Sequence, residues 1–309
     1  MIVKILGSAA GGGFPQWNCA CANCRAARAG APGFLPRTQC SVAVSADGRD
    51  WLILNASPDI RAQIEATPSL RPAGDGAPRG SPIKAVAIAN ADVDAIAGLL
   101  TLRESQAFTL LASRQVLDAL QSNVVFNVLD PLVVDRRALT LGGEAPVRGS
   151  GVGLGLTLEA FAVPGKVPLY LERADAAAFI GQEGDTIGLK VAEQSSGVSL
   201  FFIPGCARLD AALKERLAGA DLLFFDGTLF SDAELLEQGL TTKTGGRMGH
   251  MSIGGPAGSL AAFSEIGVKK KIYVHINNSN PVLNPRSRQR AEAEAAGWTI
   301  GEDGMTVSL

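Results

Sequence analysis

Three cysteines lie close together near the start of the chain, in the stretch GGGFPQWNCACANC. One residue separates Cys19 from Cys21, and Cys24 follows at the Cys-x-x-Cys spacing that lets two thiolates bind one ion. Three soft thiolates favour zinc in a closed structural site, with a fourth ligand from elsewhere in the chain. The alternative is a redox pair of Cys21 and Cys24, which leaves the third thiol without a role. The sequence therefore predicts a zinc-binding loop at residues 18–25.

Reactive side chains also follow several apolar segments further along the chain. These residues are Asp92, Asp94, Cys206, Asp226 and His275. In layered α/β proteins, binding sites gather at the ends of strands and in the loops beyond them. Each residue also has a structural explanation, because an aspartate there often caps a helix or forms a turn. A lone histidine can likewise be a hydrogen-bonded structural residue.

His250 lies in the glycine-rich stretch TKTGGRMGHMS, just before an expected helix. Loops of this kind carry function more often than packing. The alternative is a helix-terminal histidine bonded to the backbone.

The elements that must position these residues alternate between strands and helices. Apolar runs predict strands at residues 2–6, 40–46, 51–55, 84–90, 156–163, 186–192, 199–204, 221–228 and 270–276. Helix patterns occur at residues 57–66, 94–104, 207–219, 231–238, 255–267 and 285–297. Strands followed by helices in two comparable halves indicate a layered α/β protein.

Composition narrows the class of protein. The 309 residues are 47% hydrophobic and 19% charged, which is enough for a substantial core. A net charge of −2 gives no basic field for nucleic acid, and no run of about 18 apolar residues could span a membrane. An odd number of cysteines argues against a disulfide framework, and glycines at 11–13 interrupt the place of a signal peptide. We therefore expect a cytoplasmic protein.

The order of these motifs resembles that of a known family. NADVDAIAGLL, VPGK, IPGC, FDGT, GHMS and HINN follow one another as in the metallo-β-lactamase superfamily, whose αββα sandwich carries metals on successive loops. The chain more specifically resembles the family of pyrroloquinoline quinone (PQQ) synthesis protein B. The motifs that carry this resemblance are LGSAAGGGFPQWNCACANC, RTQCSVAVS, LNASPDIR, AGLLTLRE, FDGTL, TGGRMGHM and VHINNSNPVL. It implies a single metallo-β-lactamase-like α/β domain over residues 1–309, built as a four-layer αββα sandwich.

The resemblance also implies roles for individual residues. Asp94 and His275 are expected to bind an active-site metal. His250 is expected to pair with Asp226 as a positioned acid or base, which suits proton transfer near neutral pH. For oxygen chemistry, iron(II) prefers two histidines and one carboxylate on one face.

Some positions depart from the superfamily pattern. Ala95 stands where the family has a histidine after Asp94, so Asp92 becomes the candidate third ligand. Lys166 and Cys206 stand where hydrolases carry a ligand histidine and a bridging aspartate. These departures argue against a dinuclear zinc hydrolase and leave open a mononuclear site of Asp92, Asp94 and His275 that is weaker than the family's own.

The fourth ligand of the cysteine site cannot be read from the sequence. In similar cysteine-containing members of the superfamily it comes three residues after the last metal-binding histidine. Asn278 occupies that position and is a poor zinc ligand, so Cys206, another side chain or water could serve instead.

The substrate implied by the resemblance is a cross-linked Glu–Tyr unit from a precursor peptide, hydroxylated on the tyrosine ring with O₂. Such a substrate carries several carboxylates, which cations near the motif loops could bind. These cations are Arg61, Arg103, Lys166, Lys243 and Arg247, each of which could instead be an ordinary solvated charge. Lys166 is the first candidate, because nothing structural requires a lysine after Pro164 and Gly165.

Two functions remain open. The first is a PQQ-pathway hydroxylase with structural Zn²⁺ and active-site Fe²⁺, whose activity Ala95 could impair. The second is a non-catalytic carrier that binds PQQ or its precursor and assists transfer to other pathway proteins or export. The sequence also leaves open whether the chain forms a homodimer.

Overall fold

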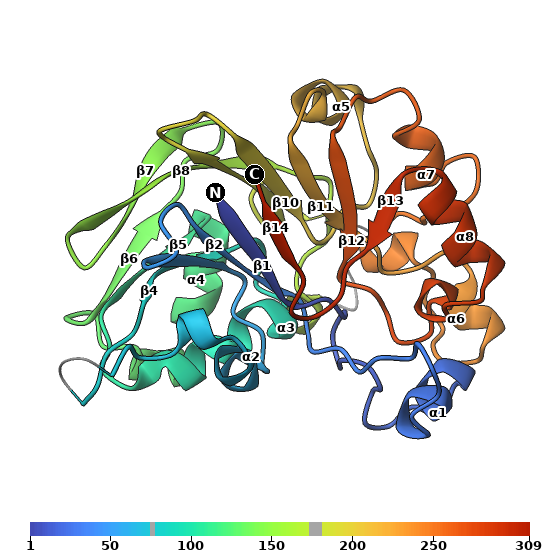
Figure 1. Cartoon of the computed structure of the whole chain (residues 1–309), viewed down its shortest axis with the longest axis horizontal. Coiled ribbons are helices and arrows are strands. Elements are labelled where there is room, and N and C mark those ends of the chain that lie inside the picture. The colour runs from blue at the N-terminus through green and yellow to red at the C-terminus, as the bar shows by residue number, and fades with distance from the viewer. Residues whose placement is uncertain (75–77, 173–180) are drawn as a thin grey trace.

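The structure is a computed structural model that describes residues 1–74, 78–172 and 181–309. Two seven-stranded sheets pack face to face, and helices lie against their outer faces (Figure 1). The expected αββα sandwich is confirmed.

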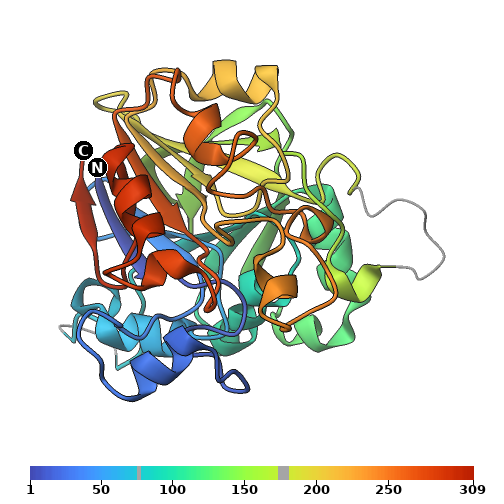
Figure 2. The ribbon, with the colours of Figure 1, turned by 90° about the vertical axis from the view of Figure 1, so that its right-hand side faces the viewer.

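The first sheet has the strand order β14-β1-β2-β3-β4-β5-β6. Its strands are β1 (Ile2–Gly7), β2 (Ser41–Ser45), β3 (Trp51–Leu54), β4 (Ile83–Ile88), β5 (Phe108–Ala112), β6 (Val134–Ala138) and β14 (Thr306–Ser308). Strands β3 to β6 are parallel, so their carboxyl ends share one edge of the sheet. Strand β14 pairs with β1, and the two chain ends lie side by side (Figures 1 and 2).

The second sheet has the strand order β13-β12-β11-β10-β9-β8-β7. Its strands are β7 (Glu144–Gly149), β8 (Val152–Ala162), β9 (Ile187–Glu193), β10 (Ser199–Ile203), β11 (Leu222–Asp226), β12 (Lys270–Val274) and β13 (Trp298–Ile300). Strands β10 to β13 are parallel, and β7 to β10 pair antiparallel. The carboxyl ends of β10, β11 and β12 therefore lie at one edge of the sheet. The loops that follow them carry the candidate site residues.

Helices complete the outer layers. The α-helices are α1 (Ala22–Arg28), α2 (Ile60–Ala66), α3 (Val93–Ile96), α4 (Arg114–Ser122), α5 (Ala211–Leu217), α6 (Glu234–Glu237), α7 (Ser259–Ala262) and α8 (Arg288–Ala295). The 3₁₀ helices are η1 (Pro68–Leu70), η2 (Ala97–Arg103), η3 (Val124–Val128), η4 (Leu169–Leu171), η5 (Gly246–Met248) and η6 (Pro281–Leu283). Helices α2 and α4 lie beside the first sheet, and α5, α7 and α8 beside the second (Figure 1).

Strand residues alternate between two apolar layers because successive side chains point to opposite faces. In β3, Leu52 and Leu54 face the core between the sheets, whereas Trp51 and Ile53 face the layer that holds the helices. All four are at most 1% exposed. Full burial of one such side chain contributes about 1.5–3 kcal/mol, which explains why β3 reads as an unbroken apolar run.

Each strand expected from the sequence is present, whereas the helices are shorter than expected. The segment 94–104 forms the four-residue helix α3 followed by the 3₁₀ helix η2. The segment 255–267 retains only α7, because glycine and proline occupy most of its first four positions. In the part of the chain that the structure describes, no helix has the length and apolar character needed to cross a bilayer.

Candidate active site and cysteine site

Asp94 and His275 meet at the edge where the two sheets come together. Asp94 lies in α3, shortly after β4, and His275 directly follows β12. Oδ2 of Asp94 is 2.8 Å from Nε2 of His275. His275 has φ of +55°, in the left-handed region that few non-glycine residues adopt, and such conformations concentrate at functional sites. The structure thus joins the two side chains implied as metal ligands.

The buried carboxylate of Asp226 supports both histidines. Its Oδ2 is 2.7 Å from Nδ1 of His250, as the expected pairing requires. Its Oδ1 is 2.6 Å from the hydroxyl of Thr228, which in turn is 2.8 Å from Nδ1 of His275. The backbone N–H of Cys206 donates to Oδ2 at 2.9 Å. Asp226 is therefore fully hydrogen-bonded, as a buried carboxylate must be.

The charges and hydrogen bonds of this network favour a protonated His275 and ionised carboxylates on Asp94 and Asp226. Burial disfavours a charged His275, but the hydrogen bond to Asp94 and the negative charges of the nearby aspartates together outweigh burial and raise the pKa of the imidazole. Burial likewise opposes ionisation of Asp94 and Asp226. The hydrogen bond from His275 nevertheless lowers the pKa of Asp94, and the charge of His250 is the main cause that lowers the pKa of Asp226.

Asp94 and His275 offer two donors to one metal ion. Neighbouring ligands of an octahedral ion with bonds of about 2.1 Å lie about 3 Å apart. The 2.8 Å between Oδ2 and Nε2 is close to this separation. Ala95, which is buried in the apolar layer outside the first sheet, supplies no third donor because its methyl side chain has no metal-binding atom. The residues therefore fit a single ion through two protein ligands.

Two further carboxylates, those of Asp226 and Asp92, lie near Asp94 and His275 and have different partners. Asp226, His250 and His275 have ligand atoms within 4.8 Å of one another, but both oxygens of Asp226 are already hydrogen-bonded. We therefore assign Asp226 to orienting His250. Oδ1 of Asp92 lies 3.4 Å from Nζ of Lys166. Asp92 is thus paired with a cation in the state that the structure describes.

The Asp94–His275 pair opens on a cavity of about 390 Å³. Its lining includes Asp92, Asp94, Lys166, Glu172, Thr228, Lys243, His250 and His275. Nζ of Lys243 donates to Glu172 at 3.1 Å, and Nη2 of Arg247 lies 3.6 Å from the same carboxylate. A second cavity of about 560 Å³ shares Lys166 and is also lined by Arg247. Lys166 therefore lines both cavities, and each cavity is also lined by another cationic side chain.

Arg61 and Arg103 are the expected cations that the structure does not bring to these cavities. Arg103 donates to the carbonyl of Leu100 at 2.8 Å and pairs with Glu104 at 3.3 Å. Neither arginine lines either cavity. Helix η2 carries Arg103 away from Asp94 although the two are close in sequence.

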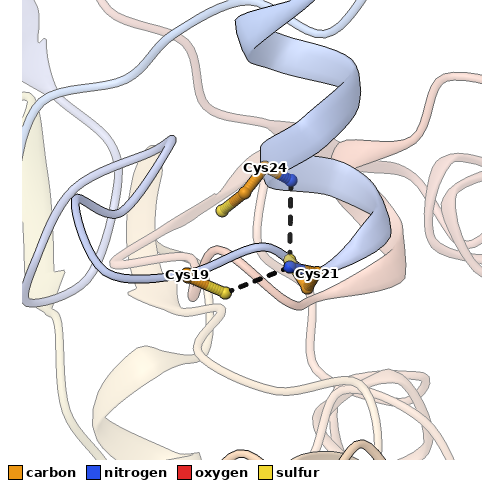
Figure 3. A group of neighbouring side chains, drawn as sticks. All are labelled: Cys19, Cys21 and Cys24. Carbon is orange, nitrogen blue, oxygen red and sulfur yellow. Dashed lines mark hydrogen bonds between the residues drawn. The ribbon is translucent and has the colours of Figure 1, made fainter.

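The three N-terminal cysteines converge on one point. Cys19 and Cys21 lie in the loop before α1, and Cys24 lies in its first turn (Figure 3). Their sulfurs are within 4.8 Å of one another. Backbone N–H groups of Cys21 and Cys24 donate to the sulfurs of Cys19 and Cys21 at 3.4 and 3.5 Å. Tetrahedral zinc with Zn–S bonds of about 2.3 Å places sulfurs about 3.8 Å apart, so a small contraction would complete the site.

Asn278 covers the open side of this cluster. Its Nδ2 lies 3.1 Å from the sulfur of Cys19, 3.3 Å from that of Cys24 and 3.7 Å from that of Cys21. Cys206 lies at the active site instead, with its thiol donating to the carbonyl of Arg208. The residue three places after His275 thus faces the three sulfurs through its amide N–H₂ group, which donates hydrogen bonds and cannot bind zinc, so an Asn278 ligand would have to present its Oδ1 instead.

The thiols differ in how readily they ionise. Burial raises the pKa of Cys24 to about 11. Burial opposes ionisation of Cys19 as well, but hydrogen bonds from Cys21, Cys24 and Asn278 outweigh it and lower the pKa of Cys19. Binding a zinc ion would drive the remaining ionisation, because the metal takes the thiolate form.

Sequence reasoning missed two residues of the active site. Thr228 touches both histidines and Asp226. The carboxylate of Glu172 forms ion pairs with Lys243 and Arg247 beside the cavity. Thr228 lies inside the FDGT motif, which marks its position but not its contacts, whereas Glu172 lies in an irregular segment with no such signal.

Comparisons with known proteins agree with this architecture. Residues 50–276 match the family model described as a β-lactamase superfamily domain. The chain is 51% identical over 307 residues to coenzyme PQQ synthesis protein B of Methylobacterium sp. (strain 4-46), covering 99% of each chain. It is 50% identical over 306 residues to the protein of the same name from Gluconacetobacter diazotrophicus, covering 98% of each. The crystal structure of Zn²⁺-bound PqqB from Methylobacterium extorquens superposes with a TM-score of 0.94, at 50% identity and with full coverage of both chains.

Proposed function

The chain belongs to the family of coenzyme PQQ synthesis protein B, and we propose that within PQQ biosynthesis it supports hydroxylation of the tyrosine ring of a Glu–Tyr precursor at an iron site, with O₂ as oxidant and an external two-electron reductant. One oxygen atom enters the ring, and the two electrons from the reductant with two protons convert the other to water. The observation that carries this proposal is the Asp94–His275 pair, which places two suitable donors 2.8 Å apart at the wall of a cavity. Iron(II), when bound, supplies the redox chemistry that allows O₂ to oxidise an aromatic ring.

His250 is the acid or base of this proposal. Its Nδ1 is held 2.7 Å from the buried carboxylate of Asp226, so Nε2 is the nitrogen that remains for the substrate. His250 lines the cavity, where Nε2 would accept the proton of the phenol as the ring is hydroxylated. Asp226 stabilises the imidazolium that results.

Lys166 and Lys243 are the cations that would bind substrate carboxylates in the cavity. Arg247 would bind a further carboxylate in the neighbouring cavity, which Lys166 also lines. A substrate with several carboxylates would in this way extend from one cavity to the other past Lys166.

Asp92 is the proposed third ligand in place of the histidine that Ala95 cannot provide. In the described structure its carboxylate is paired with Lys166 at 3.4 Å. A substrate carboxylate that pairs with Lys166 in place of Asp92 would leave the carboxylate of Asp92 available to bind the metal. Iron binding and substrate binding are therefore expected to strengthen each other.

We also propose that zinc occupies the site of Cys19, Cys21 and Cys24 as a structural ion. The converging sulfurs support this, and a similar protein of known structure is described as Zn²⁺-bound. Closed sites with thiolate ligands hold loops in place rather than activate water.

A carrier of PQQ or its precursor is the second candidate. The alanine at position 95 favours it, because Ala95 has no atom that could bind a metal next to Asp94. A carrier would use the cationic cavities without turnover.

One experiment separates the two functions. The protein is incubated anaerobically with iron(II), the Glu–Tyr precursor and ascorbate as two-electron donor and is then exposed to O₂, and products are analysed by mass spectrometry. A product heavier by one oxygen atom that requires iron and disappears in His275→Ala supports the hydroxylase. Binding of PQQ with no oxygenated product, unchanged by His275→Ala, supports the carrier.

A further inference from the structure

We propose that Thr228 is the positioning residue of the candidate active site: its hydroxyl determines which nitrogen of His275 faces Asp94, and its backbone carbonyl helps to hold the turn in which His275 is left-handed. The consequence for metal binding rests on the proposed function, whereas the positioning itself rests on contacts within the chain.

The hydroxyl of Thr228 has four neighbours and a single hydrogen. Oγ1 lies 2.6 Å from Oδ1 of Asp226, 2.8 Å from Nδ1 of His275, 3.0 Å from the carbonyl of His275 and 3.1 Å from Nδ1 of His250. A hydroxyl donates one hydrogen bond and accepts two. The carboxylate and the carbonyl can only accept, and Asp226 is the nearer and charged acceptor. The hydrogen of Thr228 therefore points mainly at Asp226.

This direction of donation leaves the oxygen of Thr228 as an acceptor for His275. Nδ1 of His275 must then carry a hydrogen, and Nε2 is the nitrogen left to face Asp94. Histidines that bind metals usually donate their other ring N–H to a fixed acceptor, which sets the tautomer and the ring orientation. The chain Asp226–Thr228–His275 provides such an acceptor.

His250 does not compete with His275 for the hydroxyl of Thr228 as a hydrogen-bond acceptor. Its Nδ1 has its own acceptor in Oδ2 of Asp226 at 2.7 Å, which is closer than Thr228 at 3.1 Å. One carboxylate thus orients His250 directly and His275 through Thr228. The two imidazoles stack with their ring centres 5.2 Å apart, so a shift of one ring would disturb the other.

Thr228 also holds the main chain around His275. The carbonyl of Thr228 accepts the N–H of Asn277 at 3.1 Å, and the N–H of Gly227 donates to the carbonyl of Val274 at 2.8 Å. These bonds fasten the end of β11 to the turn in which His275 has φ of +55°. Thr228 is 5% exposed, so water has little access to replace its hydroxyl. A left-handed histidine persists only where its surroundings impose that conformation.

Matched substitutions test the hydroxyl. Thr228→Ser keeps it, and Thr228→Val keeps the shape of the side chain without it. Because the chain contains only two histidines, imidazole ¹⁵N spectra can be assigned with a His250→Asn variant. Affinity for Zn²⁺, used as a diamagnetic probe of the Asp94–His275 site, is measured by calorimetry on protein whose cysteine site is already filled.

We expect a protonated Nδ1 on His275 in the unmodified protein and in Thr228→Ser. In Thr228→Val the Nδ1 proton of His275 should exchange at least tenfold faster, and Zn²⁺ affinity should fall at least tenfold. Wild-type spectra and affinity in a folded Thr228→Val variant would overturn the proposal. So would an unprotonated Nδ1 on His275 in the unmodified protein, a result that does not depend on whether any variant folds.

The proposed iron site can fail independently of this inference. If no probe metal binds between Asp94 and His275 in the unmodified protein, the proposed function is contradicted. The proton on Nδ1 and its exchange rate still decide the role of Thr228 in that case.

Discussion

Asp94 and His275 are 181 positions apart in the chain and follow strands of different sheets, yet Oδ2 of one lies 2.8 Å from Nε2 of the other. The contact exists because β4 and β12 both end at the same edge of the sandwich. A site built in this way depends on the packing of the two sheets against each other. It needs no long loop to bring its ligands together.

Lys166 is expected to bind a carboxylate of the substrate or product. Lys166→Met should weaken binding of PQQ about tenfold, since a lost charged hydrogen bond is worth roughly 1.5–3 kcal/mol and partial exposure reduces that value. Titration calorimetry at fixed salt measures the change. Arg103→Met is the matched control, because it removes the same charge outside both cavities. Equal losses in the two variants would show that only net charge matters.

Cys21 is expected to hold structural zinc. Cys21→Ser should reduce the zinc content below one per chain and lower the melting temperature by about 5 °C or more, because metal binding contributes to folding. Elemental analysis and calorimetry of the same samples test the link. Cys40→Ala is the control, since Cys40 is buried in the core between the sheets and away from the cluster. Unchanged zinc in Cys21→Ser would contradict the structural site.

The Asp94–His275 pair is expected to make stability depend on pH when no metal bridges it. The pKa of His275 is raised, so its contribution is complete below the usual histidine pKa of about 6.5 and is lost as pH rises through the raised value. The pKa of Asp94 is lowered, so its contribution is complete above about pH 4 and is lost on acidification. Stability from the pair should therefore peak between about pH 4 and pH 6.5.

Asp94→Asn should flatten this dependence and lower the pKa of His275. Urea unfolding across the pH range and NMR titration of the imidazole measure the two effects. Glu104→Gln serves as a control, because Glu104 pairs with Arg103 outside the cavities. An unchanged pKa of His275 in Asp94→Asn would contradict the direct pairing.

The apolar runs of the central strands, such as Trp51–Leu54, predicted a layered α/β protein, and the family resemblance implied the αββα sandwich. The edge strands β6 and β7 gave no such signal. They contain VDRRA and EAPVRG, and most of their residues are exposed or half-buried. Edge strands gain their structure from one neighbouring strand, and a polar pattern of this kind does not distinguish them from loops.

The candidate site was predictable only where a motif marked it. The proposed metal ligands Asp94 and His275 and the Asp226–His250 pair followed from the order of strand ends and from the family resemblance. Thr228 was missed because its role arises from the contact between the ends of β11 and β12, and sequence spacing does not encode that contact. Arg103 was included because it lies close to Asp94 in sequence, but η2 turns it away.

The most direct test of the account is the iron affinity of the Asp94–His275 site, measured anaerobically on the protein and on Ala95→His. We predict that both bind one iron, that Ala95→His binds it at least tenfold more tightly, and that His275→Ala abolishes binding in each background while zinc at the cysteines stays near one per chain. Tenfold corresponds to about 1.4 kcal/mol, a modest gain for a third ligand. Failure of both proteins to bind iron, or iron binding that survives His275→Ala, would contradict the account.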